Sequence, residues 1–268
     1  MGPSTSQSVQ WEPQATPPGD PGPLRAGAAV RKITPDPAEK RVYLAGFGIN
    51  RVATAVHDDL WVRALALSDG MTTIALAALD LIGLFQDDVF LILGEVSRRG
   101  ISLQGAIVAS THTHSGPDTL GLWGPNRITS GVDRDYLAWV RAQTAEAIIE
   151  AVGGLRPARL RAASVPAPGL ARNARDPSIV DDELSVLRVE EDDETAIATV
   201  TNFPCHPEVL GSKNTVITSD FPHFLRERIE SAGGGTAIHF SGDLGGMMTP
   251  DVPAHTFAEA QRMGERLA

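Results

Sequence analysis

Two histidines stand two residues apart in the segment Ala109-Ser-Thr-His-Thr-His-Ser-Gly-Pro117, directly after the apolar run Ala106–Ala109. Successive side chains of an extended segment alternate between its two faces, so His112 and His114 are predicted to point the same way. The Gly-Pro pair that follows ends the strand. Two imidazoles at the end of a strand can bind one metal ion or one substrate. The structural alternative is a pair of histidines that hydrogen-bond to backbone groups.

A third histidine, His206, lies in Phe203-Pro-Cys-His-Pro207, where a proline on each side stiffens the backbone and fixes the direction of the ring. The structural alternative is a loop histidine that stabilises a turn. Its neighbour Cys205, the only cysteine, is interpreted as a small buried residue rather than a ligand or nucleophile. A single cysteine excludes an intramolecular disulfide and a zinc site built mainly of thiolates. A metal would therefore be bound by His, Asp, Glu or Tyr.

A glycine-rich segment, Gly242–Pro250, follows a predicted strand. Free backbone N–H groups in such a segment can bind an oxyanion or a phosphate, but the Gly-Lys-Ser/Thr ending of a Walker motif is absent. Thr249 within the segment could act as a nucleophile or as a hydrogen-bond donor. A purely structural threonine before a proline is the alternative.

These polar residues all follow apolar segments that are predicted to be strands. Asp80, His112 with His114, His206 and Asp243 each stand where such a strand leaves the sheet. Ligands of α/β sheets bind outside the carboxyl ends of the strands. The sequence therefore predicts that these side chains face one crevice.

The elements that must position them follow from the hydrophobic pattern. Strands are predicted at Trp61–Leu67, Thr72–Leu79, Ala106–Ser110, Ala158–Val165, Leu184–Val189, Ala196–Asn202 and Thr236–Ser241. The strands on either side of the acidic turn at 190–194 are predicted to form an antiparallel hairpin, so the sheet is expected to be mixed. Helices are predicted at Asp87–Arg99, Arg134–Val152, Pro222–Ser231 and from Ala254 to the end. The predicted fold class is α/β, a single domain with a mixed β-sheet flanked by helices.

Composition and charge exclude several classes of protein. A chain of 268 residues with 42% hydrophobic residues can bury a large core without disulfide bonds or structural metal ions to stabilise it. The net charge of −10 and scattered basic residues argue against a nucleic-acid partner. No apolar run reaches the roughly 18 residues that span a membrane, and the start lacks the pattern of a signal peptide, so a cytoplasmic protein without a transmembrane segment is expected. The oligomeric state stays open.

The beginning of the chain differs in composition from the rest. Residues 1–25 contain six prolines and few aliphatic residues, which predicts a disordered leader. From residue 26 to residue 268 the pattern is that of one α/β domain.

Several segments together resemble the N-terminal hydrolase domain of the neutral/alkaline, non-lysosomal ceramidase family. They occur in the family's order and span almost all of the chain after the leader. Thr-His-Thr-His-Ser-Gly-Pro is the most specific of them. The matching segments are Ala26–Pro35, His57–Leu60, Leu79–Asp80, Thr111–Pro117, Asn173–Arg175, Val180–Leu184, Phe203–Pro207, Asn214–Pro222 and Gly246–Pro250.

The resemblance implies a zinc-dependent amidase of sphingolipid metabolism that hydrolyses N-acylsphingosine by attack of a metal-activated water on the amide carbonyl. It implies His112 and His206 as zinc ligands. His114 would lie beside the substrate and the metal-bound water as general acid or base, and Arg175 would help hold the developing oxyanion. Thr249 takes the place of the family's catalytic serine, whereas a neighbouring family aspartate is replaced by Met247. A water-based mechanism tolerates this replacement better than a serine nucleophile does.

The substrate is expected to be a small-molecule amide or a lipid-like amide. A metal-dependent esterase or another hydrolase on the same scaffold is the alternative enzyme, and a non-catalytic fragment that retains the fold is the alternative to an enzyme. Catalytic zinc usually has three protein ligands, and the family's further Glu and Tyr ligands come later than its Thr-Pro segment. We therefore expect either that Asp80, Asp220 or Asp243 substitutes, or that the domain is incomplete at its C-terminus. The uncapped helical pattern at Phe257–Ala268 favours the second case, so the 268-residue chain is expected to bind zinc weakly and to be inactive or nearly so.

Overall fold

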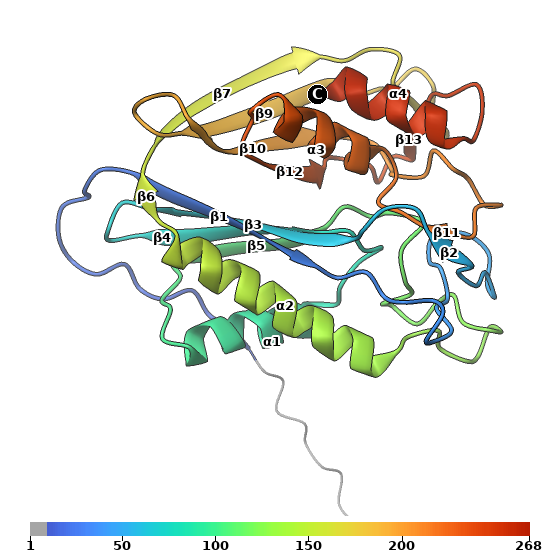
Figure 1. Ribbon diagram of the computed structural model, residues 1–268, viewed down its shortest axis with the longest axis horizontal. Coiled ribbons are helices and arrows are strands. Elements are labelled where there is room, and N and C mark those ends of the chain that lie inside the picture. The colour runs from blue at the N-terminus through green and yellow to red at the C-terminus, as the bar shows by residue number, and fades with distance from the viewer. Residues whose placement is uncertain (1–9) are drawn as a thin grey trace, which may run out of the picture.

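The computed structural model describes residues 10–268, in which helices and mixed β-sheets are stacked in layers (Figure 1). Every strand and helix predicted from the sequence is present, with boundaries shifted by a few residues at most. The described part of the chain has four helices: α1 (Gln86–Arg98), α2 (Arg134–Gly153), α3 (Phe221–Ser231) and α4 (Phe257–Leu267). None of these helices is long and apolar enough to cross a membrane.

The first main sheet has the strand order β5-β4-β3-β1-β6. Strands β4 and β5 run parallel, and the other pairs are antiparallel. The strands are β1 (Arg25–Lys32), β3 (Trp61–Ser68), β4 (Thr73–Leu79), β5 (Gly105–Ser110) and β6 (Arg156–Pro157). Strand β1 was not predicted, because its alanines and its glycine have low intrinsic strand propensity. It forms because β3 pairs with it along its whole length.

The second main sheet has the order β12-β10-β9-β7. Strands β9 and β10 are antiparallel, which confirms the predicted hairpin, and β10 and β12 are parallel. The strands are β7 (Arg159–Pro166), β9 (Glu183–Glu190), β10 (Ala196–Phe203) and β12 (Thr236–Ser241). The α/β class and the mixed pairing are therefore confirmed, and the strands are divided between two main sheets.

Two short pairs of strands lie beside the main sheets. Strand β2 (Ala55–Val56) pairs in parallel with β11 (Val216–Ile217), and β8 (Ala171–Asn173) pairs antiparallel with β13 (Met248–Pro250). Neither pair was predicted, because two or three residues are too few for a recognisable alternation of apolar and polar side chains.

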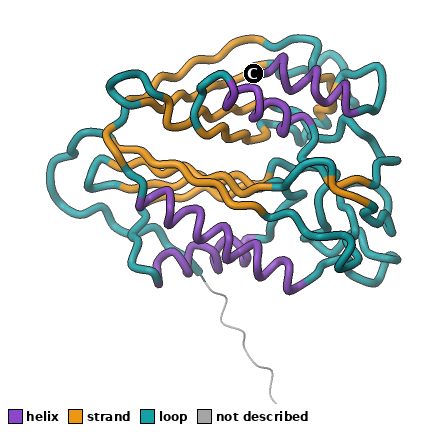
Figure 2. Tube along the Cα trace, in the orientation of Figure 1, coloured by secondary structure: helices purple, strands orange, loops and turns teal. Residues whose placement is uncertain are grey.

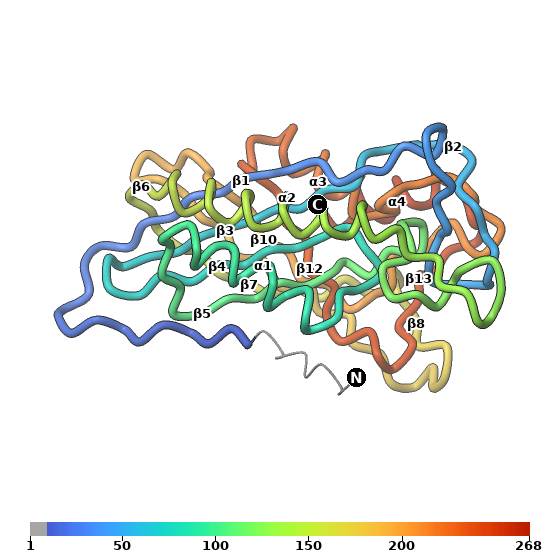
Figure 3. The backbone as a smooth tube through the Cα atoms, turned by 90° about the horizontal axis from the view of Figure 1, so that it is seen from below, coloured from blue at the N-terminus to red at the C-terminus, as the bar shows by residue number. Residues whose placement is uncertain are grey.

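The two main sheets lie face to face, with α1 and α2 on one side and α3 and α4 on the other (Figure 2). Seen from below, α1 and α2 cross the first sheet side by side (Figure 3). Each interface contains its own apolar cluster. Representative side chains are Leu79, Ile92 and Ile148 between the first sheet and its helices, Leu65, Val200 and Ile238 between the sheets, and Phe203, Leu225 and Met263 beneath α3 and α4.

Residues 10–24 contain no helix or strand. Trp11 packs against the first apolar cluster, and the backbone N–H of Gln14 donates to the carbonyl of Leu103 at 2.9 Å. The first nine residues of the predicted leader lie outside the described residues. The division into residues 1–25 and 26–268 stays a prediction.

Candidate functional site

The ends of four strands from both main sheets meet at one place. Strands β4 and β5 are parallel, and so are β10 and β12, so the two strands of each pair have their carboxyl ends at the same end of their sheet. The loops after β5 and β12 are joined by the hydroxyl of Ser241, which donates to the carbonyl of Thr111 at 2.6 Å. The N–H of His114 donates to the carbonyl of Pro207 at 3.1 Å, which joins the loops after β5 and β10.

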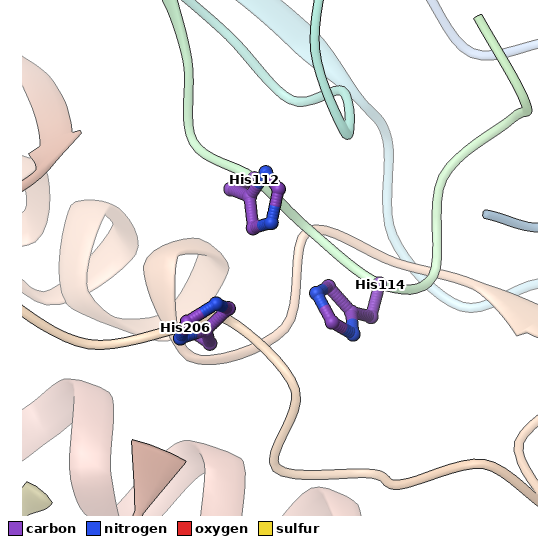
Figure 4. A group of neighbouring side chains, drawn as sticks. All are labelled: His112, His114 and His206. Atoms are coloured by element: carbon purple, nitrogen blue, oxygen red, sulfur yellow. The ribbon is translucent and has the colours of Figure 1, made fainter. Parts of the chain in front are cut away.

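His112, His114 and His206 form one group at this meeting point (Figure 4). One ligand nitrogen from each ring lies within 4.8 Å of the others. The ring centroids are 5.2 Å apart for His112 and His114, 5.2 Å for His112 and His206, and 5.5 Å for His114 and His206. The structure thus brings together the three histidines that the sequence singled out.

His112 reaches this position through a turn rather than through the alternation of a strand. Strand β5 ends at Ser110, and His112 has a φ of 66°, in the left-handed region that non-glycine residues seldom adopt. Its N–H donates to the carbonyl of Leu81 at 3.0 Å, and its Nδ1 lies 2.6 Å from the carbonyl oxygen of Ile82. The predicted proximity of His112 and His114 holds, but the extended geometry invoked for it was wrong.

His206 is fixed in a similar way from the second sheet. Its backbone N–H and its Nδ1 both contact the carbonyl oxygen of Met248, at 3.0 and 2.6 Å. A carbonyl oxygen can only accept, so Nδ1 carries the proton in His112 and in His206. The Nε2 atom of each ring then keeps its lone pair, which is the tautomer found in histidines that bind metals.

His114 is held by a carboxylate instead of a carbonyl group. Its Nδ1 lies 3.1 Å from Oε2 of Glu208, and both of its buried ring nitrogens lack a hydrogen bond of regular geometry among residues 10–268. The ring of Phe47 meets the imidazole edge-on, with centroids 4.8 Å apart. The Arg51 guanidinium donates to the carbonyl of His114 and fixes the backbone there.

The pKa shifts of His112 and Glu208 favour the binding of a cation at the histidine group. Burial and the neighbouring His114 lower the pKa of His112, which favours the neutral ring. Burial opposes ionisation of Glu208, but hydrogen bonds with His114 and Thr249 outweigh it and hold the pKa of Glu208 below its ordinary value. A neutral His112 ring in a group beside the ionised Glu208 carboxylate suits metal binding, which needs an unprotonated ring nitrogen.

A metal ion fits these donors. Zinc–nitrogen bonds are about 2.0–2.1 Å long, so two imidazole nitrogens on one ion lie at most about 4.2 Å apart. The ligand nitrogens of the three rings lie within 4.8 Å of one another, close to that span. The two buried ring nitrogens of His114 lack a hydrogen bond of regular geometry within residues 10–268, and such atoms are costly unless a molecule bound at the site satisfies them.

Neither a family model nor a curated protein matches the sequence. Among solved structures, a neutral ceramidase from Pseudomonas aeruginosa superposes with a TM-score of 0.79 over 92% of this chain, at 21% sequence identity. This chain has a ceramidase-like fold. A ceramidase complexed with C2 matches with a TM-score of 0.78, also at 21% identity and 92% coverage. The matches cover 44% and 43% of those chains, so the ceramidase-like domain described here spans less than half of their length. The resemblance inferred from the sequence is confirmed at the level of the fold.

Thr249 lies beside the histidine group in this ceramidase-like domain, on strand β13. Its hydroxyl donates to Oε1 of Glu208 at 2.7 Å, so it reaches His114 through that carboxylate. Arg175 follows β8, the partner of β13, and its exposed side chain forms no hydrogen bond or ion pair within residues 10–268. The roles predicted for Thr249 and Arg175 stay predictions.

The three aspartates considered as substitute ligands lie outside the histidine group. Asp80 forms a buried two-point ion pair with Arg226, at 2.7 and 2.8 Å. Asp220 begins α3, where its carboxylate accepts backbone N–H bonds, and burial raises its pKa to about 7. Asp243 is exposed. Each carboxylate is therefore either committed to another partner or turned toward solvent.

Glu208 and Gly46 are the residues of the site that sequence reasoning missed. Glu208 stands two residues after His206, and a carboxylate so near a candidate metal ligand was a signal that could have been used. Gly46 gave no such signal, because its contact with His114 joins positions 68 residues apart in sequence (114 minus 46).

Proposed function

We propose that this chain is a zinc-dependent hydrolase of linear amide bonds that acts on lipid-like amides. The observation that carries the proposal is the convergence of three histidines, of which His112 and His206 have Nδ1 on a backbone carbonyl and His114 has Nδ1 3.1 Å from the Glu208 carboxylate. The ceramidase-like fold supports an amide as the bond and a lipid as the substrate class.

His112 and His206 would hold the ion through Nε2, because backbone carbonyls fix their rings most tightly. A zinc ion bound there would polarise the amide carbonyl and lower the pKa of a water molecule to about 7. Both effects matter because an amide is a poor electrophile. In this proposal the protein orients the two rings through the carbonyl oxygens of Ile82 and Met248.

His114 would act as general base and then as general acid. The carboxylate of Glu208 behind Nδ1 stabilises a ring that has taken up a proton, whereas a backbone carbonyl would do so less strongly. His114 would take a proton from the attacking water and donate it to the leaving nitrogen. The resemblance implies that Arg175 would add positive charge near the developing oxyanion. This role would require its exposed side chain to close over the substrate.

The experiment measures zinc content, zinc affinity and fatty-acid release from a panel of N-acyl amides and matching esters, with and without a chelator. His112→Ala and His206→Ala should weaken zinc binding by about 100-fold or more, because even changes to outer partners of a ligand cost about 10–100-fold. His114→Ala should keep zinc and lose turnover. His223→Ala, a histidine of α3 outside the group, serves as the matched control.

Unchanged zinc content in both the His112 and His206 variants would refute the metal site. Turnover of the esters alone would make the chain a metal-dependent esterase. Zinc binding without any turnover would indicate a fold that is retained without catalysis.

A further inference from the structure

We infer that Glu208 is the positioning residue that orients His114, and that Thr249 acts by holding Glu208 rather than as a nucleophile. This inference deepens the proposed function and rests on it. It adds a residue that the sequence reasoning did not assign, and it changes the expected role of Thr249.

The two oxygens of the Glu208 carboxylate have separate partners. Oε2 lies 3.1 Å from Nδ1 of His114, and Oε1 accepts the hydroxyl proton of Thr249 at 2.7 Å. The side chains of His114 and Glu208 are only 10% and 13% exposed, so water competes little for these contacts. A carboxylate fixed at both oxygens sets the direction from which the imidazole is held.

Three separate segments supply this chain of contacts. Glu208 lies in the loop after β10, where its N–H donates to the carbonyl of His206 at 2.9 Å. Thr249 lies on β13, opposite Arg172 of β8, and His114 lies in the loop after β5. The backbone hydrogen bond from the N–H of His114 to the carbonyl of Pro207 joins the two loops that carry the imidazole of His114 and the carboxylate of Glu208.

The contacts of His114 favour one of its two ring nitrogens as the one with a free lone pair. An ionised carboxylate only accepts, so its position 3.1 Å from Nδ1 favours the tautomer with the proton on Nδ1 and the lone pair on Nε2. Both ring nitrogens are buried without a hydrogen bond of regular geometry within residues 10–268, but it is Nδ1 that has the Glu208 carboxylate at 3.1 Å, in a ring grouped with His112 and His206.

The same geometry gives Thr249 a supporting role. Its hydroxyl proton is already donated to a carboxylate whose other oxygen holds His114. The β-branched threonine side chain has a restricted χ1, which suits a residue that holds a neighbour in one position.

The test uses the whole chain with selective ¹⁵N-histidine labelling. In the metal-free protein, wild-type His114 should show the Nδ1–H tautomer, with His114→Ala used to assign the signal. Glu208→Ala should abolish that preference and lower kcat about 10–100-fold, with KM and zinc stoichiometry little changed. Glu208→Gln, which keeps an acceptor for Nδ1, should retain more of the tautomer and of kcat. Glu39→Gln, an exposed glutamate remote from the histidines in sequence, is the matched control.

Thr249→Val should lower kcat less than Glu208→Ala does, and Thr249→Ser should retain most of the activity. An unchanged His114 tautomer in Glu208→Ala would overturn the assignment of Glu208. Complete loss of turnover in Thr249→Val with a wild-type His114 signal would overturn the role of Thr249 and favour a nucleophile. The tautomer is measured without substrate or metal, so it tests this inference even if the proposed hydrolysis fails.

Discussion

Gly46 is in direct contact with the imidazole of His114. A Cβ at position 46 would lie 2.3 Å from Cγ of His114, and the backbone there has a φ of +98°, which side chains rarely tolerate. The ring is thus confined between Gly46, Phe47 and the Glu208 carboxylate. At the scale of single residues, the position of His114 depends on the absence of a side chain at Gly46 as much as on the contact with Glu208.

Gly46→Ala should therefore displace His114 and lower turnover by at least about tenfold, while His112 and His206 still bind zinc. Gly48→Ala is the matched control, because a Cβ at position 48 meets nothing within 4 Å. Steady-state kinetics and zinc content of both variants test the prediction. Equal activity of the two variants would show that the ring has room to move.

Helices α3 and α4 pack at very close range, and this contact supports the loops of the site. A Cβ at Gly264 of α4 would lie 2.5 Å from the carbonyl oxygen of Phe221 and 2.7 Å from the N of Leu225, both in α3. Just before α4, the Nδ1 of His255 contacts the carbonyl oxygen of Val209, in the loop that also holds His206 and Glu208. At the scale of elements, the docking of α4 is coupled to the loop that supplies two groups of the site.

Gly264→Ala should destabilise the fold by about 1–3 kcal/mol, because the added methyl group forces the two helix backbones apart. Gly94→Ala in α1 is the matched control, since a Cβ there meets nothing within 4 Å. That control should raise stability by roughly 0.5–1 kcal/mol through the higher helix propensity of alanine. Urea unfolding of both variants measures the difference. An unchanged free energy of unfolding in Gly264→Ala would mean that α4 can shift without loss of stability.

The layers of the molecule are joined by buried charge as well as by apolar contacts. Arg226 of α3 forms its two-point ion pair with Asp80, which directly follows β4 of the first sheet. Asp80 also accepts the N–H of Trp61 at 2.9 Å, and Arg226 donates to the hydroxyl of Ser219 at 2.8 Å. At the scale of the whole molecule, this pair fixes the first sheet relative to α3 on the far side of the second sheet.

Arg226→Met should cost about 3–5 kcal/mol, because it leaves the carboxylate of Asp80 buried without its counter-ion. Asp80→Asn combined with Arg226→Met should recover part of the loss, since no full charge is then left unpaired. Chemical unfolding at neutral pH of the single and double variants measures the coupling. Additive losses in the double variant would show that the two side chains stabilise the fold independently.

The sequence by itself determined the four helices, most of the long strands and the three histidines. Alternating and helical hydrophobic patterns depend on neighbours a few residues away, so the hairpin of β9 and β10 and the helices α1 and α2 could be predicted. The small-residue strand β1 could not, because only pairing with β3 makes it a strand. The histidines could be found because their spacing and flanking prolines are local features.

Only the tertiary structure decided how those histidines are arranged. The division of the strands into two sheets brings the loop with His112 and His114 next to the loop with His206. It also places Glu208 and Thr249 in one chain of contacts with His114, and it pairs Asp80 with Arg226 instead of leaving that carboxylate for a metal. These contacts join residues far apart in sequence. They are set by packing and by the need of buried polar groups for partners, which no local pattern records.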